Sequence, residues 1–396
     1  MDSNLHESIC HPEGKQNGYV NGNIVANSNY SNGIKNGEIK NGHAGTSTEQ
    51  KQEYKMQIKW LNVLLFAYLH GAALYGMIMP WKWSSFAVCF VYTALAGFGT
   101  TVAAHRYFTH RSFKANKKLR WILIILQTTC AQEPILNWAR DHRVHHKFTD
   151  TDADPYNSRR GFFFSHIGWL MVKKHPEVIR QGKKIDMSDL ESDPMLQFQR
   201  RWYHLLAFLL NLGIPIVFLT YMGEPFSVIW HGNIFRWVIQ LNLVWCVNSV
   251  AHLYGTKPYD KDISPTDSRL VGFLAMGEGW HNYHHVFPWD YKTAELPGYG
   301  WNLSTAVIDF FAWLGWATEL KTVPDAIIKK RVLRTGDGSH PYSIAAVEEN
   351  NNNLSDEIDA QTQIRDTEHF WGFGDKEMTS EDMKYVHIIN PEKKIS

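Results

Sequence analysis

Eight histidines of this sequence stand in three short groups whose spacing suits metal binding. The groups are His105 and His110, then His142, His145 and His146, and finally His281, His284 and His285. Positions i, i+3 and i+4 lie on one side of a helix, so the second and third groups each present three imidazoles together. Neutral imidazole is a good ligand for divalent iron, zinc or copper, whereas magnesium and calcium favour oxygen ligands. Because eight histidines exceed what one ion can hold, the spacing predicts a site for two metal ions.

The first histidine pair and a ninth histidine leave alternatives open. On an ideal helix about 140° separates the side chains of His105 and His110, so either the helix is distorted there or the two bind different ions. His252 follows Asn248 by four residues and shares its helical face. A histidine in an apolar segment is costly unless it has a partner, so His252 is a further candidate ligand. A hydrogen bond from His252 to a neighbouring helix is the alternative, and for the three groups the alternative is separate surface histidines.

The histidine groups follow long apolar segments, which indicates a membrane protein. Four segments approach the ~20 residues that span a bilayer core, and they cover residues 60–79, 84–104, 205–222 and 235–253. Short turns join the first segment to the second and the third to the fourth. The expected fold class is therefore an all-α integral membrane protein. Its four transmembrane helices form two hairpins, and a helical cytosolic cap holds the metal centre.

Two shorter helices and two tails complete the expected organisation. Residues 121–136 are apolar but short and polar in places, which favours an interfacial or re-entrant helix over a full span. Residues 303–320 have helical apolar spacing and are expected to pack on the membrane surface or the cap. Residues 1–55 are rich in Asn and Gly and are expected to be a disordered tail. Residues 336–396 are expected to be a flexible polar tail, which leaves 56–335 as the folded domain.

Positive charge gives the orientation in the membrane. The two hairpin turns hold one lysine between them, whereas the loop 105–203 and the stretch after the last span are rich in Lys and Arg. The positive-inside rule therefore puts this loop, both termini and all three histidine groups in the cytosol. The N-terminus lacks the apolar core of a signal peptide. Lys393-Lys394 is similar to a dilysine retrieval signal, so we expect a multi-pass protein of the endoplasmic reticulum membrane.

Composition argues against several classes of protein. The formal net charge of +1 is too low for a typical nucleic-acid binder. Cys10, Cys89, Cys130 and Cys246 are widely spaced and form no CxxC pair, so neither a disulfide framework nor a thiolate zinc site is indicated. The mean hydropathy of −0.31 looks soluble because two polar tails lower the mean of an apolar middle.

The three histidine groups resemble the histidine boxes of membrane acyl-CoA desaturases, the stearoyl-CoA desaturase family. The boxes are His105-Arg-Tyr-Phe-Thr-His110, His142-Arg-Val-His-His146 and His281-Asn-Tyr-His-His285. The resemblance covers roughly residues 56–335 and extends through Asn62, Leu69-His70-Gly71, Asn157 to His166, Asn248 to Gly255 and Gly277 to Trp280. Residues Leu296 to Asn302 are most similar to insect members, some of which make pheromone precursors.

This resemblance implies a cofactor, a reaction and partners. It implies a di-iron centre held by the eight box histidines and His252, with Asn248 reaching one iron through water. It implies O₂-dependent removal of two hydrogens from a long-chain saturated acyl-CoA, which leaves a cis double bond of the delta-9 or delta-11 type. The electrons would come from NADH through cytochrome b5 reductase and cytochrome b5.

The resemblance also implies which residues contact the acyl-CoA. They are Asn62, Trp138, Arg140, Asp141, Trp169, Lys173, Lys174 and Trp245. Lys173 and Lys174 are the candidates for the phosphates of coenzyme A, with ordinary positive-inside charge as the alternative. Arg140 and Asp141 would contact the polar part, and Trp138 would shape the acyl tunnel together with Trp245. Residues 132–137 depart from the pattern of the family near the place where the acyl chain is expected to bend. The resemblance therefore predicts neither the position of the double bond nor the preferred length of the acyl chain.

Two rival functions share some of these features. A membrane fatty-acid hydroxylase or alkane monooxygenase would use the same di-iron oxidant, but the match outside the boxes favours a desaturase. A histidine-rich zinc transporter would need polar groups near the middle of the membrane, whereas these histidines lie at the ends of spans.

Overall fold

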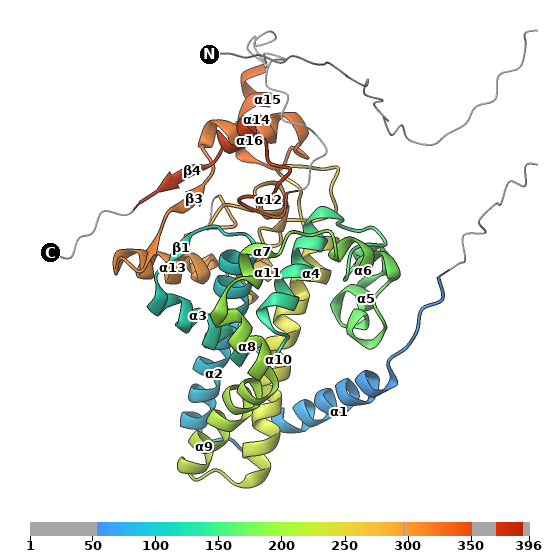
Figure 1. The fold of residues 1–396 in the computed structure, drawn as a ribbon, viewed down its shortest axis with the longest axis vertical. Helices are drawn as coiled ribbons and strands as arrows, with labels where there is room; N and C mark the ends of the chain where they lie inside the picture. Colours follow the sequence, from blue (N-terminus) through green and yellow to red (C-terminus); the bar gives the residue numbers. More distant parts are fainter. Residues whose placement is uncertain (1–53, 296–297, 351–369, 391–396) are drawn as a thin grey trace, which may run out of the picture. The chain divides into compact units, whose positions relative to one another are not determined.

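A computed structural model describes residues 54–295, 298–350 and 370–390 (Figure 1). The predicted N-terminal tail, apart from its last two residues, lies outside this part of the chain, and so do Lys393 and Lys394. The described residues are mainly helical, with two small two-stranded sheets. This agrees with the expected all-α class.

Four helical segments are long and apolar enough to cross a membrane, as predicted. They are α1 (Trp60–Met77), α2 with the π-helix η1 (Trp83–Phe98 and Gly99–Thr109), α8 with η4 and α9 (Pro194–Ala207, Phe208–Gly213 and Ile214–Tyr221), and α10 (Phe226–Leu253). Three of them are longer than their apolar stretches. Helix α8 starts early because Pro194 occupies its first turn and the Asp193 carboxylate accepts a hydrogen bond from the Met195 N–H. The added turns of η1 and α8 extend these two spans into the cap, whereas α10 is longer at its start, beside the turn after α9.

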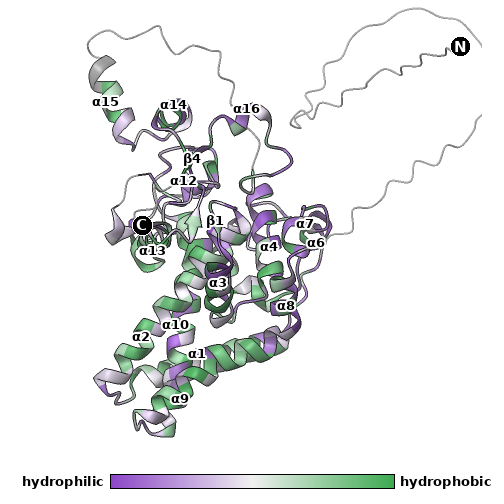
Figure 2. Cartoon of the chain, turned by 60° about the vertical axis from the view of Figure 1, so that its left-hand side comes forward, coloured by the Kyte–Doolittle hydropathy of each residue, from purple (hydrophilic) through white to green (hydrophobic). Residues whose placement is uncertain are grey.

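The spans pack closely where small residues meet and carry apolar side chains on their outer faces. A Cβ atom at Gly76 of α1 would lie 2.3 Å from the carbonyl oxygen of His231 in α10, so only glycine allows this approach. Leu61 and Val217, by contrast, are 80% and 68% exposed. Figure 2 shows α1, α2, α9 and α10 as mostly hydrophobic, while the polar residues gather in the cap. Such a surface suits contact with lipid.

The cap consists of short helices and two pairs of strands. The helices are α3 (Lys117–Thr129), α4 (Ile135–Lys147), η2 (Ser158–Arg160), α5 (Phe162–His166), η3 (Gly168–Met171), α6 (Pro176–Gly182), α7 (Ser188–Glu191), α11 (Arg269–Leu274), α12 (His281–Val286), η5 (Tyr299–Trp301), α13 (Leu303–Trp313), α14 (Asp325–Thr335), α15 (Pro341–Asn350) and α16 (Ser380–Met383). Strand β1 (Lys114–Ala115) pairs antiparallel with β2 (Ala317–Thr318), and β3 (Leu320–Thr322) pairs antiparallel with β4 (His387–Ile389).

The two shorter helices expected from the sequence differ in extent from the observed ones. The segment 121–136 contains the end of α3 and, after a break before Pro134, the start of α4. Helix α3 has 13 residues, and its Leu119 and Leu123 are buried in the main core cluster. It is therefore too short to span the membrane and packs as a helix of the cap. Helix α13 ends at Trp313, because Gly315 has a φ of +69° and turns the chain, and residues 317–318 then form strand β2.

Residues 370–390 pack onto the cap instead of extending as a flexible tail. Strand β4 lies beside β3, and Trp371 is only 3% exposed. Residues 341–350 form helix α15, so the expectation of a flexible tail from residue 336 is wrong for these stretches. Burial of an aromatic side chain fixes the segment in place. The signal for it in the sequence is Phe370-Trp371-Gly372-Phe373, an aromatic run within a polar region.

Candidate metal centre

All nine histidines expected at the metal site are buried and converge in two groups. The first group is His105, His110, His142, His146 and His284, and the second is His145, His252, His281 and His285. Within each group the ligand atoms lie within 4.8 Å of one another. The groups touch, since the rings of His146 and His285 stack with centroids 4.2 Å apart. The second and third boxes each contribute to both groups, so one box does not correspond to one ion.

A π-helix explains how His105 and His110 reach the same group. The second span changes from α2 to η1 at Gly99, and the His110 N–H donates to the carbonyl oxygen of His105 over 3.1 Å. This i to i+5 bond widens the turn, so side chains five residues apart face the same side. Of the two alternatives left by the sequence, the helix is distorted. A Cβ atom at Gly99 would lie 2.1 Å from the carbonyl oxygen of Leu126, which shows how closely α3 packs on this turn.

The ring nitrogens are arranged as metal ligands, and hydrogen bonds among them cannot account for their positions. The Nε2 atom of His284 lies 2.9 Å from that of His105 and 3.0 Å from that of His146. In the second group, Nε2 of His281 lies 3.0 Å from that of His252 and 3.1 Å from that of His285. A neutral ring nitrogen carries either one proton or one lone pair, so it cannot bond two such neighbours well. Nitrogens that share an ion at about 2.1 Å lie roughly 3 Å apart.

Three further histidines strengthen the fit to a metal. The buried Nε2 atoms of His110, His142 and His145 have no hydrogen-bond partner within the described part of the chain. Buried polar atoms are normally paired, and a metal ion would satisfy all three. Burial and then the neighbouring histidines hold the pKa of His142 and of His146 well below the usual range. These imidazoles are therefore neutral, which is the form that binds metals.

Hydrogen bonds on the opposite ring nitrogens fix the orientation of several histidines. Nδ1 of His145 lies 2.9 Å from the Asp154 carboxylate, and Nδ1 of His142 lies 3.3 Å from the Tyr156 hydroxyl. The His110 Nδ1–H donates to the carbonyl oxygen of Trp371. Such partners select the tautomer that leaves Nε2 free for a metal. Sequence reasoning missed all three partners, although Asp154-Pro155-Tyr156 stands close to the second box.

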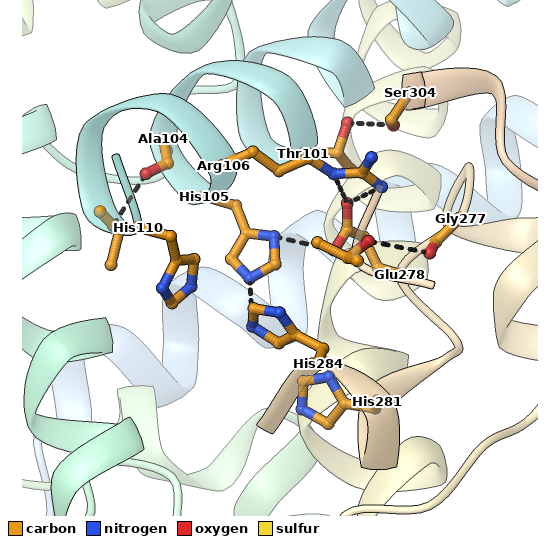
Figure 3. A network of polar contacts seen from close by, with 12 residues as sticks. Thr101, Ala104, His105, Arg106, His110, Gly277, Glu278, His281, His284 and Ser304 are labelled. Carbon is orange, nitrogen blue, oxygen red and sulfur yellow. Dashed lines mark hydrogen bonds and ion pairs between the residues drawn. The ribbon is translucent and has the colours of Figure 1, made fainter. Parts of the chain in front are cut away.

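A buried ion pair holds the first and third boxes together (Figure 3). Glu278 lies with one carboxylate oxygen 2.8 Å from Nδ1 of His105 and with the other 2.9 Å from Nη2 of Arg106. Arg106 is fully buried and also donates to the Tyr291 carbonyl and the Thr305 hydroxyl. Burial raises the pKa of Glu278, but Arg106 and His105 outweigh it, so the carboxyl pKa is lowered. The carboxylate stays ionised and orients His105.

Comparison with known proteins agrees with this geometry. The sequence pattern of a family described as fatty acid desaturase matches residues 81–301. An acyl-CoA Delta-9 desaturase of Acheta domesticus is 47% identical over 346 residues, which cover 86% of this chain and 89% of that protein. The chain belongs to the fatty acid desaturase family. Its activity is therefore that of an acyl-CoA desaturase, an oxidoreductase.

Two further relatives have names that give different double-bond positions. An acyl-CoA Delta12-desaturase of Acheta domesticus is 43% identical over 363 residues, covering 89% of this desaturase and 92% of the relative. An acyl-CoA Delta(11) desaturase of Trichoplusia ni is 48% identical over 300 residues, which cover 75% of this chain and 85% of the relative. Because similar identities accompany different positions, the double-bond position does not follow from family membership.

The desaturase has an apolar cavity of about 260 Å³ that leads to the metal centre. Three histidines of the two groups form part of its wall, namely His105, His142 and His281. At the cap the wall includes Asp141, and towards the middle of the membrane it continues along α10 to Gln240 and Trp237. The cavity is therefore polar at one end and mostly apolar along the spans, which suits an acyl chain with a polar head.

Half of the residues expected to contact the acyl-CoA lie in this wall, and Asn248 lies there too. They are Trp138, Asp141, Trp169 and Trp245, whereas Asn62, Arg140, Lys173 and Lys174 lie outside the wall. Lys174 reaches it indirectly, because its ammonium donates to the Asp141 carboxylate. The Asn62 amide donates to the carbonyl oxygen of Leu170 over 2.7 Å and so holds α1 against the wall. Lys173, next to Lys174 in the chain, is exposed.

Proposed function

We propose that this desaturase holds two iron ions in its two histidine groups and uses O₂ to convert a long-chain saturated acyl-CoA into a cis-unsaturated one. The observation that carries the proposal is the shared position of the histidines and the apolar cavity. Because His105, His142 and His281 form part of the wall, a chain in the cavity runs directly past the centre. The product would serve the synthesis of unsaturated fatty acids or pheromone precursors.

The reaction needs a strong oxidant and a dry site. An unactivated C–H bond is beyond the reach of protein side chains, and bound iron with O₂ supplies the oxidant. The apolar wall, including Trp138 and Trp245, holds the chain and excludes water. Removing two hydrogens while O₂ is reduced to water also consumes two electrons and two protons. We assign the electrons to cytochrome b5 and its NADH-dependent reductase.

The ligand assignment follows the two groups. The five-histidine group would hold one ion and the four-histidine group the other. Asn248 stands in the cavity wall one helical turn before His252, and we assign its amide to the second ion, which it would reach through a water molecule. A polar side chain in a transmembrane helix that faces a cavity is by default a functional residue.

Expression in a yeast strain without its own desaturase tests the proposal. We expect unsaturated fatty acids to appear, with the double-bond positions given by mass spectrometry, and iron in the purified protein. Hydroxylated acids in their place would contradict the proposal and indicate a hydroxylase. Zinc in the purified protein, with no oxygen consumption, would contradict it in favour of a zinc transporter.

Reversing the charge of Lys173 and Lys174 is expected to weaken acyl-CoA binding. Both would become glutamate near Asp141, the carboxylate that now accepts from Lys174. The apparent KM for acyl-CoA should rise on the order of tenfold with iron content unchanged, because the change affects anion binding and not ligation. Steady-state kinetics and metal analysis measure the two effects.

A matched control for this variant is the exposed pair Lys183 and Lys184 in the same loop. Changing these two to glutamate alters the net charge equally but should leave the KM near that of the parent protein. An equal rise in both variants would assign the effect to general charge, and no rise in either would place coenzyme A elsewhere.

We also propose that the protein resides in the endoplasmic reticulum membrane with both termini in the cytosol. The three acceptor sequons at Asn29, Asn302 and Asn353 should then remain unmodified, because cytosolic segments never meet the glycosyltransferase. Asn302 is also only 2% exposed, so Asn29 and Asn353 carry the test of topology. A band shift on glycosidase treatment of the expressed protein would contradict this orientation.

A further inference from the structure

One buried polar side chain in the acyl cavity has no role in the site described so far. Gln240 of α10 lines the cavity and is only 2% exposed. Neither its amide nitrogen nor its amide oxygen has a hydrogen-bond partner within the described part of the chain. Burying an amide without partners is unfavourable, so such a side chain in a ligand cavity points to a ligand that pairs with it.

The polar neighbours of Gln240 in the wall are already engaged elsewhere. The Trp237 indole N–H donates to the carbonyl oxygen of Cys130 over 3.2 Å, and the Thr93 hydroxyl donates to that of Cys89 over 2.8 Å. Many other members of the wall are apolar, among them Phe66, Leu69, Leu241 and Val244. Thr100, Gln132 and Glu133 are further polar members of the wall, and the Gln132 amide donates to the Thr100 hydroxyl over 3.3 Å and accepts from the Trp138 indole over 3.2 Å. The Gln240 amide differs from that of Gln132 because neither of its polar atoms has a partner within the described residues.

Arg236, one turn before Gln240, has two of its three guanidinium nitrogens engaged with other residues. Its Nε and Nη2 donate to the Asn233 side chain over 3.0 and 2.7 Å, and Nη2 donates also to the Asn211 carbonyl over 2.6 Å. Its Nη1 is unpaired within the described residues, as is the Gln240 oxygen. A trapped water between these two groups is therefore the competing explanation for Gln240.

The place of Gln240 along the cavity defines which part of a substrate it meets. It stands eight residues before Asn248 in the continuous helix α10, which is about 12 Å along the helix axis. Asp141 belongs to α4 in the cap, whereas Gln240 lies deeper in the membrane than Asn248, because α10 runs from the turn after α9 toward the cap. An acyl chain whose head lies near Asp141 therefore brings its methyl half to Gln240.

We infer that Gln240 forms a polar subsite for the methyl half of the acyl chain and favours chains that carry a hydrogen-bond acceptor there. This inference rests on the proposed function. A cis double bond accepts an N–H weakly through its π electrons, and a hydroxyl group can both accept from the nitrogen and donate to the oxygen of the amide. A fully saturated chain leaves the amide unpaired. The carbons to be oxidised are saturated in every case, so the reaction itself is unchanged.

The test uses competition between substrates on the full-length, iron-loaded enzyme with its electron donors. Octadecanoyl-CoA competes with the same acyl-CoA bearing either one cis double bond or one hydroxyl near the methyl end. Wild type is compared with Gln240→Met, which keeps the side-chain length but removes the amide. The ratio of kcat/KM for substituted over saturated chains should fall about threefold for the double bond and on the order of tenfold for the hydroxyl. Both kcat/KM values come from one preparation, so a smaller amount of folded protein lowers both equally and leaves their ratio unchanged.

Leu243→Met is the matched control, because Leu243 lies in the same helix and wall but has no polar group. Its ratio should stay within about twofold of wild type, since an apolar residue replaces an apolar one. An unchanged ratio in Gln240→Met would overturn the inference and assign the amide to trapped water. If wild type desaturates none of the three chains, the proposed function fails as well, which distinguishes the two failures.

Discussion

Replacing His252 with alanine is expected to abolish desaturation and to release about one of the two proposed iron ions per protein. His252 is the one member of the two groups that lies outside the three boxes, and its Nε2 is 3.0 Å from that of His281. Loss of a ligand should cost more than the 10- to 100-fold that outer partners of ligands typically cost, so activity should fall by roughly 100-fold or more. Metal analysis of the purified protein and the yield of unsaturated product measure the two effects.

Two variants of the same helix serve as controls for His252→Ala. His231→Ala removes a histidine of α10 whose Nδ1 lies 2.9 Å from the Ser227 carbonyl, far from the metal centre in the chain, and it should retain full iron. Asn248→Ala should retain most iron and lose activity by about 10- to 100-fold, because that amide is proposed to act through water. Two bound irons in His252→Ala would contradict the nine-histidine site. His252 would then only stabilise the packing of neighbouring helices.

The sequence was sufficient to predict the spans and the histidines because both are local patterns. About twenty apolar residues in a row define a span, and H-x-x-H-H places three imidazoles on one side of a helix. Even His252 followed from a single segment, since a polar residue in an apolar span needs a partner. The observed spans and the two groups agree with these predictions.

The partition of the histidines and the residues that orient them depend on contacts between distant parts of the chain. Glu278 contacts His105 although 173 positions (278 − 105) separate them in the sequence. The residue types alone do not show that these two side chains form a pair. The π-helix that aligns His105 with His110 begins at Gly99, where α3 packs closely, and local propensity does not encode such a contact. Such tertiary contacts decide which ring meets which ion.

The C-terminal segment is the clearest case, because its polar composition suggested a tail while its few aromatic residues fix it to the site. The Trp371 carbonyl accepts from His110, and the Phe373 N–H donates to the His110 carbonyl over 3.0 Å. The guanidinium carbon of Arg143 lies 3.8 Å from the centre of the Trp371 ring. Between these contacts stands Gly372, with a φ of +149°. Residues 371–373 thus contact the end of the first histidine box.

Gly372→Val is therefore expected to lower both bound iron and activity, although it lies far from every box in the sequence. A Cβ atom at Gly372 would come within 2.6 Å of the Cα and carbonyl oxygen of His110, so the segment must move away and release His110 Nδ1. Loss of an orienting partner typically costs 10- to 100-fold in metal affinity or activity. Gly338→Val is the matched control, because Gly338 also has a positive φ but has nothing within 4 Å of its Cβ position. Backbone strain alone would lower the heat stability of both variants equally and spare their iron. Full iron and activity in Gly372→Val, measured beside this control, would contradict a role of the C-terminal segment at the metal centre.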